Sequence, residues 1–92
     1  MNVSVKPLNG YHMSDYDFDC EFYVYSNRRV LINKSEMVMI DDDNYVAVLD
    51  SEKVGRIGKG HVRMTFTAYV PNEFFPDGLK TEKEDVCTDL VL

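Results

Sequence analysis

A ten-residue stretch of two-residue alternation, from Tyr16 to Tyr25, constrains the fold more than any other feature of this chain. Apolar side chains occupy every second position, and most of the positions between them are acidic. The apolar set is Tyr16, Phe18, Cys20, Phe22 and Val24, and the other set is Asp15, Asp17, Asp19, Glu21, Tyr23 and Tyr25. Alternate side chains of a strand point to opposite faces, whereas a helix would spread these carboxylates around its surface. The pattern predicts a half-buried β-strand.

A second alternating stretch, from His61 to Val70, predicts another long strand. Its apolar set is Val62, Met64, Phe66, Ala68 and Val70. The Thr and Tyr residues between them suit a pleated face in contact with solvent. Pro71 lacks a backbone N–H, so we expect it to end the strand.

Shorter signals predict the remaining elements. The run 41–44, Asp-Asp-Asp-Asn, predicts a hairpin turn because Asp and Asn side chains bond their own backbone in turns. We expect short strands at 3–5, 30–32, 37–40, 45–49 and 86–92, and short helical turns at 51–54 and 72–75. Asp50 or Ser51 could cap the first helical turn, and Gly55, Gly58 and Gly60 predict a loop after it.

The composition is that of one globular domain. The 92 residues are 45% apolar and 28% charged, which excludes a disordered or low-complexity chain. Several short strands separated by turn residues favour two packed sheets over a mixed fold. We therefore predict a single all-β domain over residues 1–92, an immunoglobulin-like antiparallel β-sandwich of about seven strands.

Charge and hydropathy bear on partners and location. The net charge of −6 disfavours binding to nucleic acid or anionic lipid. No apolar run reaches the roughly 18 residues of a membrane span, and the first ten residues lack the apolar core of a signal peptide, so secretion by one is not expected. A local basic segment nevertheless exists: Lys53, Arg56, Lys59, His61 and Arg63.

The two cysteines leave their pairing open. Cys20 lies in the apolar set of the first strand, which favours a small buried side chain. Its neighbours Asp19 and Glu21 are expected to raise its thiol pKa. A disulfide with Cys87 is the alternative.

The acidic residues at 41–52 have the spacing of a calcium loop only in part. Asp41, Asp43 and Glu52 match the first, third and last ligand positions, but Tyr45 and Val46 stand where an oxygen ligand and a glycine are needed. We interpret this segment as an acidic hairpin turn.

Two further patterns lack residues that a catalytic motif requires. The run 55–60, Gly-Arg-Ile-Gly-Lys-Gly, lacks the Ser or Thr of a phosphate loop and leads into a strand, so we interpret it as a basic loop. His12 and His61 have neither the spacing of a zinc site nor an evident catalytic partner. We expect no metal, no cofactor and no catalytic residue.

Surface tyrosines and basic residues are the candidate contacts. Tyr23, Tyr25 and Tyr69 fall on the polar faces of their strands, and an exposed Tyr buries large area at modest entropic cost. Packing beneath the loop 72–79 is the alternative. The other candidate contact residues are Arg56, Lys59 and Arg63.

Two stretches carry a resemblance to a known group of proteins. They are Tyr45–Gly55 (YVAVLDSEKVG) and Val70–Glu82 (VPNEFFPDGLKTE). Together they resemble small proteins of bacterial prophages and, more distantly, the N-terminal β-sandwich domains of phage baseplate and tail-fibre adaptor proteins. The resemblance implies an immunoglobulin-like sandwich that serves as an assembly part, made in the bacterial cytoplasm and carried in the virion.

The leading hypothesis is therefore a non-enzymatic structural module, whose partners are other structural proteins or further copies of itself. The acidic face (Asp15, Asp17, Asp19 and Glu21) could meet the basic segment between copies or within one molecule. A solvated face, or one that holds a cation, is the other interpretation. The alternative function is a carbohydrate-binding β-sandwich that uses the tyrosines as a stacking platform, and an enzyme is the least favoured.

Overall fold

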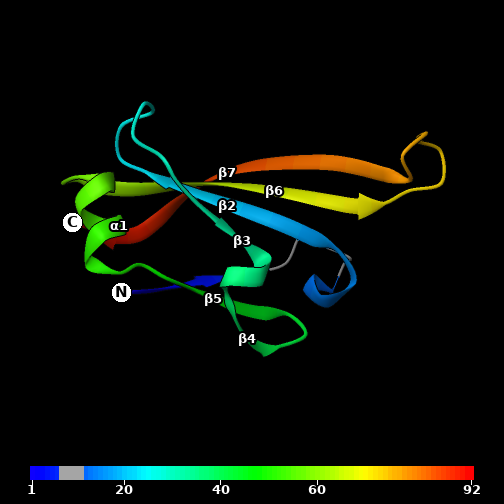
Figure 1. Ribbon diagram of the computed structural model, residues 1–92, viewed down its shortest axis with the longest axis horizontal. Coiled ribbons are helices and arrows are strands. Elements are labelled where there is room, and N and C mark those ends of the chain that lie inside the picture. The colour runs from blue at the N-terminus through cyan, green and yellow to red at the C-terminus, as the bar shows by residue number, and fades with distance from the viewer. Residues whose placement is uncertain (7–11) are drawn as a thin grey trace.

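The computed structural model describes residues 1–6 and 12–92, which form two antiparallel β-sheets and one short α-helix (Figure 1). The strands are β1 (Asn2–Val5), β2 (Asp17–Tyr23), β3 (Val30–Asn33), β4 (Val38–Asp41), β5 (Asn44–Val48), β6 (His61–Pro71) and β7 (Leu79–Val91). The helical elements are η1 (Met13–Asp15), η2 (Lys34–Glu36) and α1 (Ser51–Ile57), of which η1 and η2 are single 3₁₀ turns.

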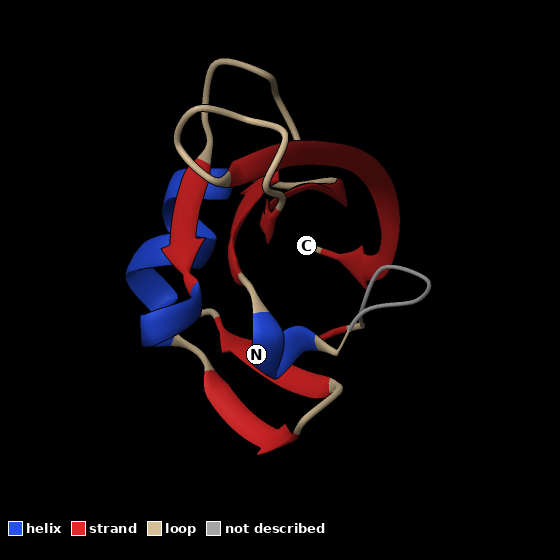
Figure 2. Cartoon of the chain, turned by 90° about the vertical axis from the view of Figure 1, so that its right-hand side faces the viewer, coloured by secondary structure: helices blue, strands red, loops and turns tan. Residues whose placement is uncertain are grey.

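The predicted all-β sandwich of seven strands is confirmed. One sheet has the order β1–β5–β4 and the other the order β3–β2–β6–β7, and the second sheet curls strongly (Figure 2). In one respect the strand order differs from that of a seven-stranded immunoglobulin domain, whose second strand lies in the same sheet as the first and fifth. Here β2 lies between β3 and β6.

The pairing of β2 with β6 follows the two predicted alternations. Phe18 lies opposite Ala68, Cys20 opposite Phe66, and Phe22 opposite Met64, and all six residues are buried. A shift of one residue would turn this apolar set to the other face of the sheet, so burial determines the register.

An aromatic cluster around Phe18 joins the two sheets. The Phe18 ring lies 5.3 Å from Tyr45 of β5 in an edge-to-face arrangement and 5.2 Å from Phe66 of β6. Ring pairs at such separations add about 0.5–1.5 kcal/mol each to the burial of their area. The core therefore extends through both layers at this point.

Lys34 secures the crossing from β3 to β4 on one side of the sandwich. Its ammonium donates to the carbonyl oxygens of Met13 (2.9 Å), the first residue of η1, and of Tyr16 (2.7 Å), which directly follows η1. It also lies about 5.5 Å from the Tyr45 ring and 5.6 Å from the Phe18 ring. These bonds satisfy backbone acceptors that a 3₁₀ turn leaves free.

Three predicted boundaries were wrong. The helix α1 extends through Gly55, where a loop is predicted, because the Gly58 amide donates to the Val54 carbonyl oxygen (3.2 Å) and closes a further turn. Asp50 caps its start by accepting from the Lys53 amide (2.9 Å). The segment 72–75 is a turn rather than helical. The last strand begins at Leu79 rather than at residue 86, because backbone pairing with β6 extends the ladder through a polar sequence that carries no alternation.

Replacing Phe22 with Ala should destabilise the domain by about 3–5 kcal/mol, because the ring is fully buried and its removal leaves a cavity. Urea unfolding followed by circular dichroism measures the change. Phe74→Ala is the matched control, since this ring is 87% exposed, and it should alter stability by less than about 0.5 kcal/mol. Equal losses in the two variants would contradict the described core.

Candidate interaction surfaces

One end of the molecule gathers exposed basic side chains around α1. The chain leaves this helix through Gly58, whose φ of +93° favours glycine. Arg28, in the turn between β2 and β3, donates to the Gly55 carbonyl oxygen (3.3 Å). Arg28 and the Tyr25 ring both lie 3.6 Å from the point where a Cβ atom on Gly58 would sit. The turn and the helix therefore form one surface.

We call this surface the basic end. Its charged side chains are Arg28, Lys53, Arg56, Lys59, Asp50 and Glu52. Lys53, which is half-buried, pairs with Asp50 at 3.3 Å, and exposed Arg56 pairs with exposed Glu52 at 3.9 Å. Ion pairs this accessible to solvent contribute little stability. Positive charges outnumber negative ones here, although the whole chain is acidic.

Of the predicted contact residues, Tyr25, Arg56 and Lys59 thus lie at the basic end. Tyr25 is 54% exposed, as expected. Arg63 does not join them: it lies on β6, opposite Tyr23 of β2 and Cys87 of β7.

The expectation that Tyr23 is exposed was wrong. Only 7% of this residue is accessible, because the Arg29 guanidinium lies 4.0 Å above its ring. Alternation correctly placed Tyr23 on the outer face of the sheet but did not show that another side chain covers it. The three tyrosines therefore do not form one exposed platform.

Arg29, which sequence reasoning missed, organises a polar network across the outer face of the larger sheet. It lies 3.7 Å from the Glu21 carboxylate and donates to the Thr65 hydroxyl (3.3 Å), which itself donates to Asp85 (2.7 Å). The network joins β2, β6 and β7. It explains why Thr65 is buried on a face predicted to be solvated.

Two residues of the acidic face, Asp19 and Glu21, are thus engaged within the molecule by groups outside the basic segment. Glu21 meets Arg29, and Asp19 accepts a hydrogen bond from the Tyr69 hydroxyl (3.0 Å). That bond raises the Tyr69 pKa, with burial adding to the effect. Asp15 ends η1 instead of continuing the strand. The pairs described for Lys53 and Arg56 are with acids of their own helix and its cap.

The two cysteines are free thiols. Cys20 is buried, as predicted, and its pKa rises to about 12, mainly through burial and secondarily through Asp19. Cys87 is exposed on β7, and β6 separates it from β2. Two strand spacings of about 4.8 Å exceed the reach of a disulfide.

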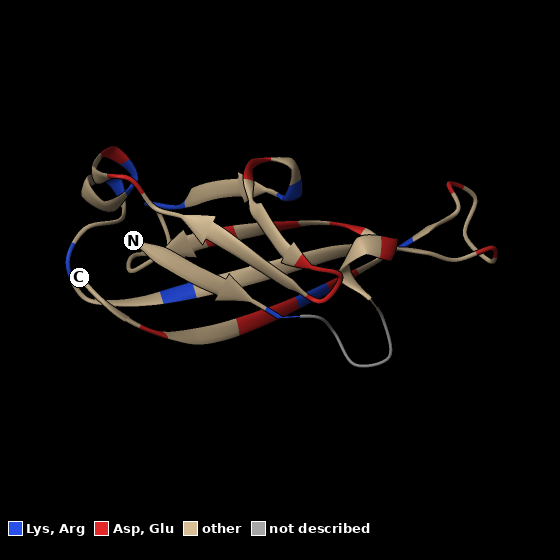
Figure 3. Cartoon of the chain, turned by 90° about the horizontal axis from the view of Figure 1, so that it is seen from below, with Lys and Arg blue, Asp and Glu red and all other residues tan. Residues whose placement is uncertain are grey.

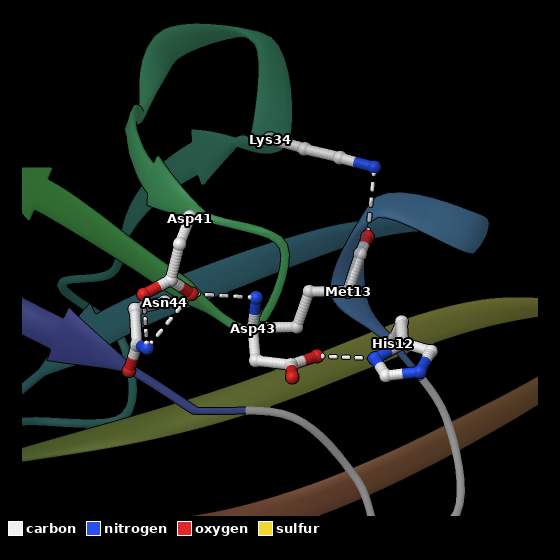
Figure 4. Close-up of polar contacts among 6 residues, drawn as sticks. All are labelled: His12, Met13, Lys34, Asp41, Asp43 and Asn44. Atoms are coloured by element: carbon white, nitrogen blue, oxygen red, sulfur yellow. Dashed lines mark hydrogen bonds and ion pairs between the residues drawn. The ribbon is translucent and has the colours of Figure 1, made fainter.

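The acidic hairpin turn between β4 and β5 uses its carboxylates internally (Figure 4). Asp41 accepts from the Asp43 amide (2.9 Å) and from the Asn44 side chain (2.8 Å). Asp43 pairs with exposed His12 at 2.9 Å. This pairing raises the His12 pKa, first through the hydrogen bond and then through the carboxylate charge.

The His12 imidazole should titrate above 6.5, as measured by NMR. Because the folded pKa is raised, the pair stabilises the fold fully below the unfolded value, and this contribution is lost as pH rises through the folded pKa. Asp43→Ala should lower the His12 pKa, whereas Glu84→Gln should leave it unchanged. A wild-type pKa at or below 6.5 would contradict the described pair.

The opposite end of the molecule is the tip of the β6–β7 hairpin, which projects beyond the other elements (Figure 1). Phe74 is 87% exposed there and Phe75 45%. The loop is nevertheless ordered by hydrogen bonds. The Asn72 side chain accepts from the Phe74 amide (2.9 Å), and the Asn72 amide donates to the Gly78 carbonyl oxygen (2.8 Å). The Gly78 amide in turn donates to the Phe75 carbonyl oxygen (2.9 Å). The exposed rings therefore stand on a preorganised turn.

Beside these rings lies an open hollow of about 570 Å³, lined by Phe75, Pro76, Asp77, Leu79, Lys80 and Thr81. A second opening of about 580 Å³ lies between the edges of β1 and β7, with Val3, Met64, Val86 and Leu90 among its lining residues. His61 lines neither opening. It contacts the Thr88 carbonyl oxygen on the neighbouring strand instead.

The edge strand β4 is a further exposed apolar feature. Val38 and Met39 are each 51% exposed and Ile40 is 62% exposed. β4 pairs only with β5, so its outer edge carries no strand partner among the described residues. An edge strand with apolar side chains is a site where another chain can pair.

Comparisons with known proteins do not place the chain in a family. No protein-family model, curated protein or solved structure matches it. Within residues 1–6 and 12–92, no helix has the length and apolar character needed to cross a membrane.

Proposed function

We propose that this protein is a non-enzymatic interaction module that assembles with other protein chains through its exposed sheet edge. The observation that carries the proposal is β4: three consecutive apolar residues, Val38–Ile40, are each more than half exposed on a strand with an open edge. An added strand gains main-chain hydrogen bonds there and covers the apolar side chains.

The surroundings of β4 extend the apolar surface. Val46 of β5 lies opposite Val38, and Val48 of the same strand is 45% exposed. Alternate residues of a strand face the same side of the sheet, so Val38, Val46 and Val48 share its outer face. The register of β4 shifts between Met39 and Asp41, which leaves Ile40 exposed at the irregularity. A partner that covers this face would remove a contiguous apolar area from water.

The biological setting proposed for the module is a phage-like tail or baseplate, where repeated contacts between chains build the particle. The resemblance of residues 45–55 and 70–82 to prophage proteins motivates this setting. The projecting hairpin and the open strand edges suit such a part, because both present contact surfaces without rearrangement of the core.

Ile40→Lys should change stability by less than about 0.5 kcal/mol, because the side chain is 62% exposed and makes no core contact. Ile32→Lys, at a position 2% exposed, should prevent folding. Thermal and urea unfolding measure both. A large loss of stability in Ile40→Lys would indicate that this residue serves the fold rather than a partner.

In the organism, the chain should occur in purified phage-like particles at a fixed ratio to their other structural proteins, as quantified by mass spectrometry after induction. The Ile40→Lys variant should be folded in the lysate but depleted from the particles. Glu84→Lys is the control for an added charge at a distant exposed position and should be incorporated normally. Particles that lack the wild-type chain would overturn the proposed setting.

A further inference from the structure

We infer that copies of this chain associate head to tail, with the basic end of one copy docked on the hairpin tip of the next. The inference deepens the proposed function by naming one partner, a second copy, and it rests on surfaces other than β4. The two ends lie at opposite extremes of a molecule 42 Å long (Figure 1). A contact between unlike ends repeats indefinitely unless a ring closes.

The tip carries the receiving surface. Its open hollow of about 570 Å³ has the apolar walls of Phe75, Pro76 and Leu79, and Phe74 stands exposed beside it. Glu73 and Asp77 make the loop acidic (Figure 3). Lys80, which lines the hollow, is paired with Glu82 at 3.2 Å. An occupant must therefore combine an apolar group with positive charge.

The basic end offers both. Tyr25 is more than half exposed, and Arg28 lies beside it against the end of α1. Lys59 follows that helix in the sequence and is also exposed. A Tyr ring fills such a hollow, while Arg and Lys side chains meet Asp77, which lines the hollow, and Glu73 of the same loop. The exposed Phe74 face can in addition receive a guanidinium.

Preorganisation favours this contact at both ends. The tip loop is held by its own hydrogen bonds, and the basic end is held by the bond from Arg28 to the Gly55 carbonyl. Little conformational entropy is then lost on docking, which leaves more of the contact energy as affinity. Charge attraction between unlike ends further predicts that salt weakens the association.

Sedimentation of the whole chain across a concentration series, at about 0.02 M and about 0.5 M salt, tests the inference. The wild type should form a ladder of oligomers at low salt that shortens at high salt. Phe74→Ala and Tyr25→Ala remove exposed rings without touching the core, and each should weaken the association about tenfold or more. Glu84→Lys is the control and should associate like the wild type.

Charge exchange provides the sharper experiment. Glu73→Lys and Lys59→Glu should each reduce self-association, since each substitution removes the excess charge of one end and with it the attraction to the other end. An equimolar mixture of the two variants should recover it, because every altered end now meets an opposite one. Circular dichroism establishes whether each charge variant is folded. If one of them is unfolded, the Phe74→Ala and Tyr25→Ala variants still test the contact independently.

Three other results would overturn the inference. They differ from the results that would overturn the proposed function, which depends on β4. A chain that stays monomeric at about 1 mM and low salt has no head-to-tail contact of useful strength. Association that survives Phe74→Ala but is lost in Ile40→Lys belongs to β4, which supports the proposed module and rejects this arrangement. Phe74-dependent binding of a monomer to phosphatidylcholine vesicles would assign the tip to a membrane instead.

Discussion

The pairing of β2 with β6 is the constraint on which the rest of this structure depends. Both strands alternate apolar and polar residues, and only one register buries both apolar sets together. Phe18 then reaches across to Tyr45 and attaches the smaller sheet to the larger one. The outer faces of the same strands receive the Arg29 network. One pairing therefore positions the core, the second layer and the polar surface.

The sheet edges of this small sandwich are covered on one side and open on the other. On one side, η2 and the Lys34 ammonium close the crossing between the sheets. On the other side, the edges of β1 and β7 leave an opening, and β4 remains an exposed edge. The β6–β7 hairpin extends past the sheet that supports it. A short chain has too few residues to cover every sheet edge, so its candidate contact sites lie where covering elements are missing.

The candidate contact surface was predictable only in part. Tyr25, Arg56 and Lys59 were expected to be exposed, and they lie at one end of the molecule. Arg29 was missed because nothing in a run of turn residues marks which cation folds back over the sheet. Phe74 was missed because an aromatic residue in a turn is ordinarily expected to pack. The signal that could have found it was the pair of prolines, Pro71 and Pro76, which stiffen the loop around it.

Amino-acid order alone was enough for the fold class, the two central strands and the burial of Cys20, because two-residue periodicity is a local property that burial enforces directly. The tertiary structure decided the long polar strand β7, the covering of Tyr23 and the grouping of basic residues at one end. Each of these depends on which distant segment becomes a neighbour: β7 exists through its ladder with β6, and Arg29 covers a ring six positions away only because the turn between them folds back. Periodicity assigns a side chain to a face, whereas its surroundings are determined only when the sheets assemble.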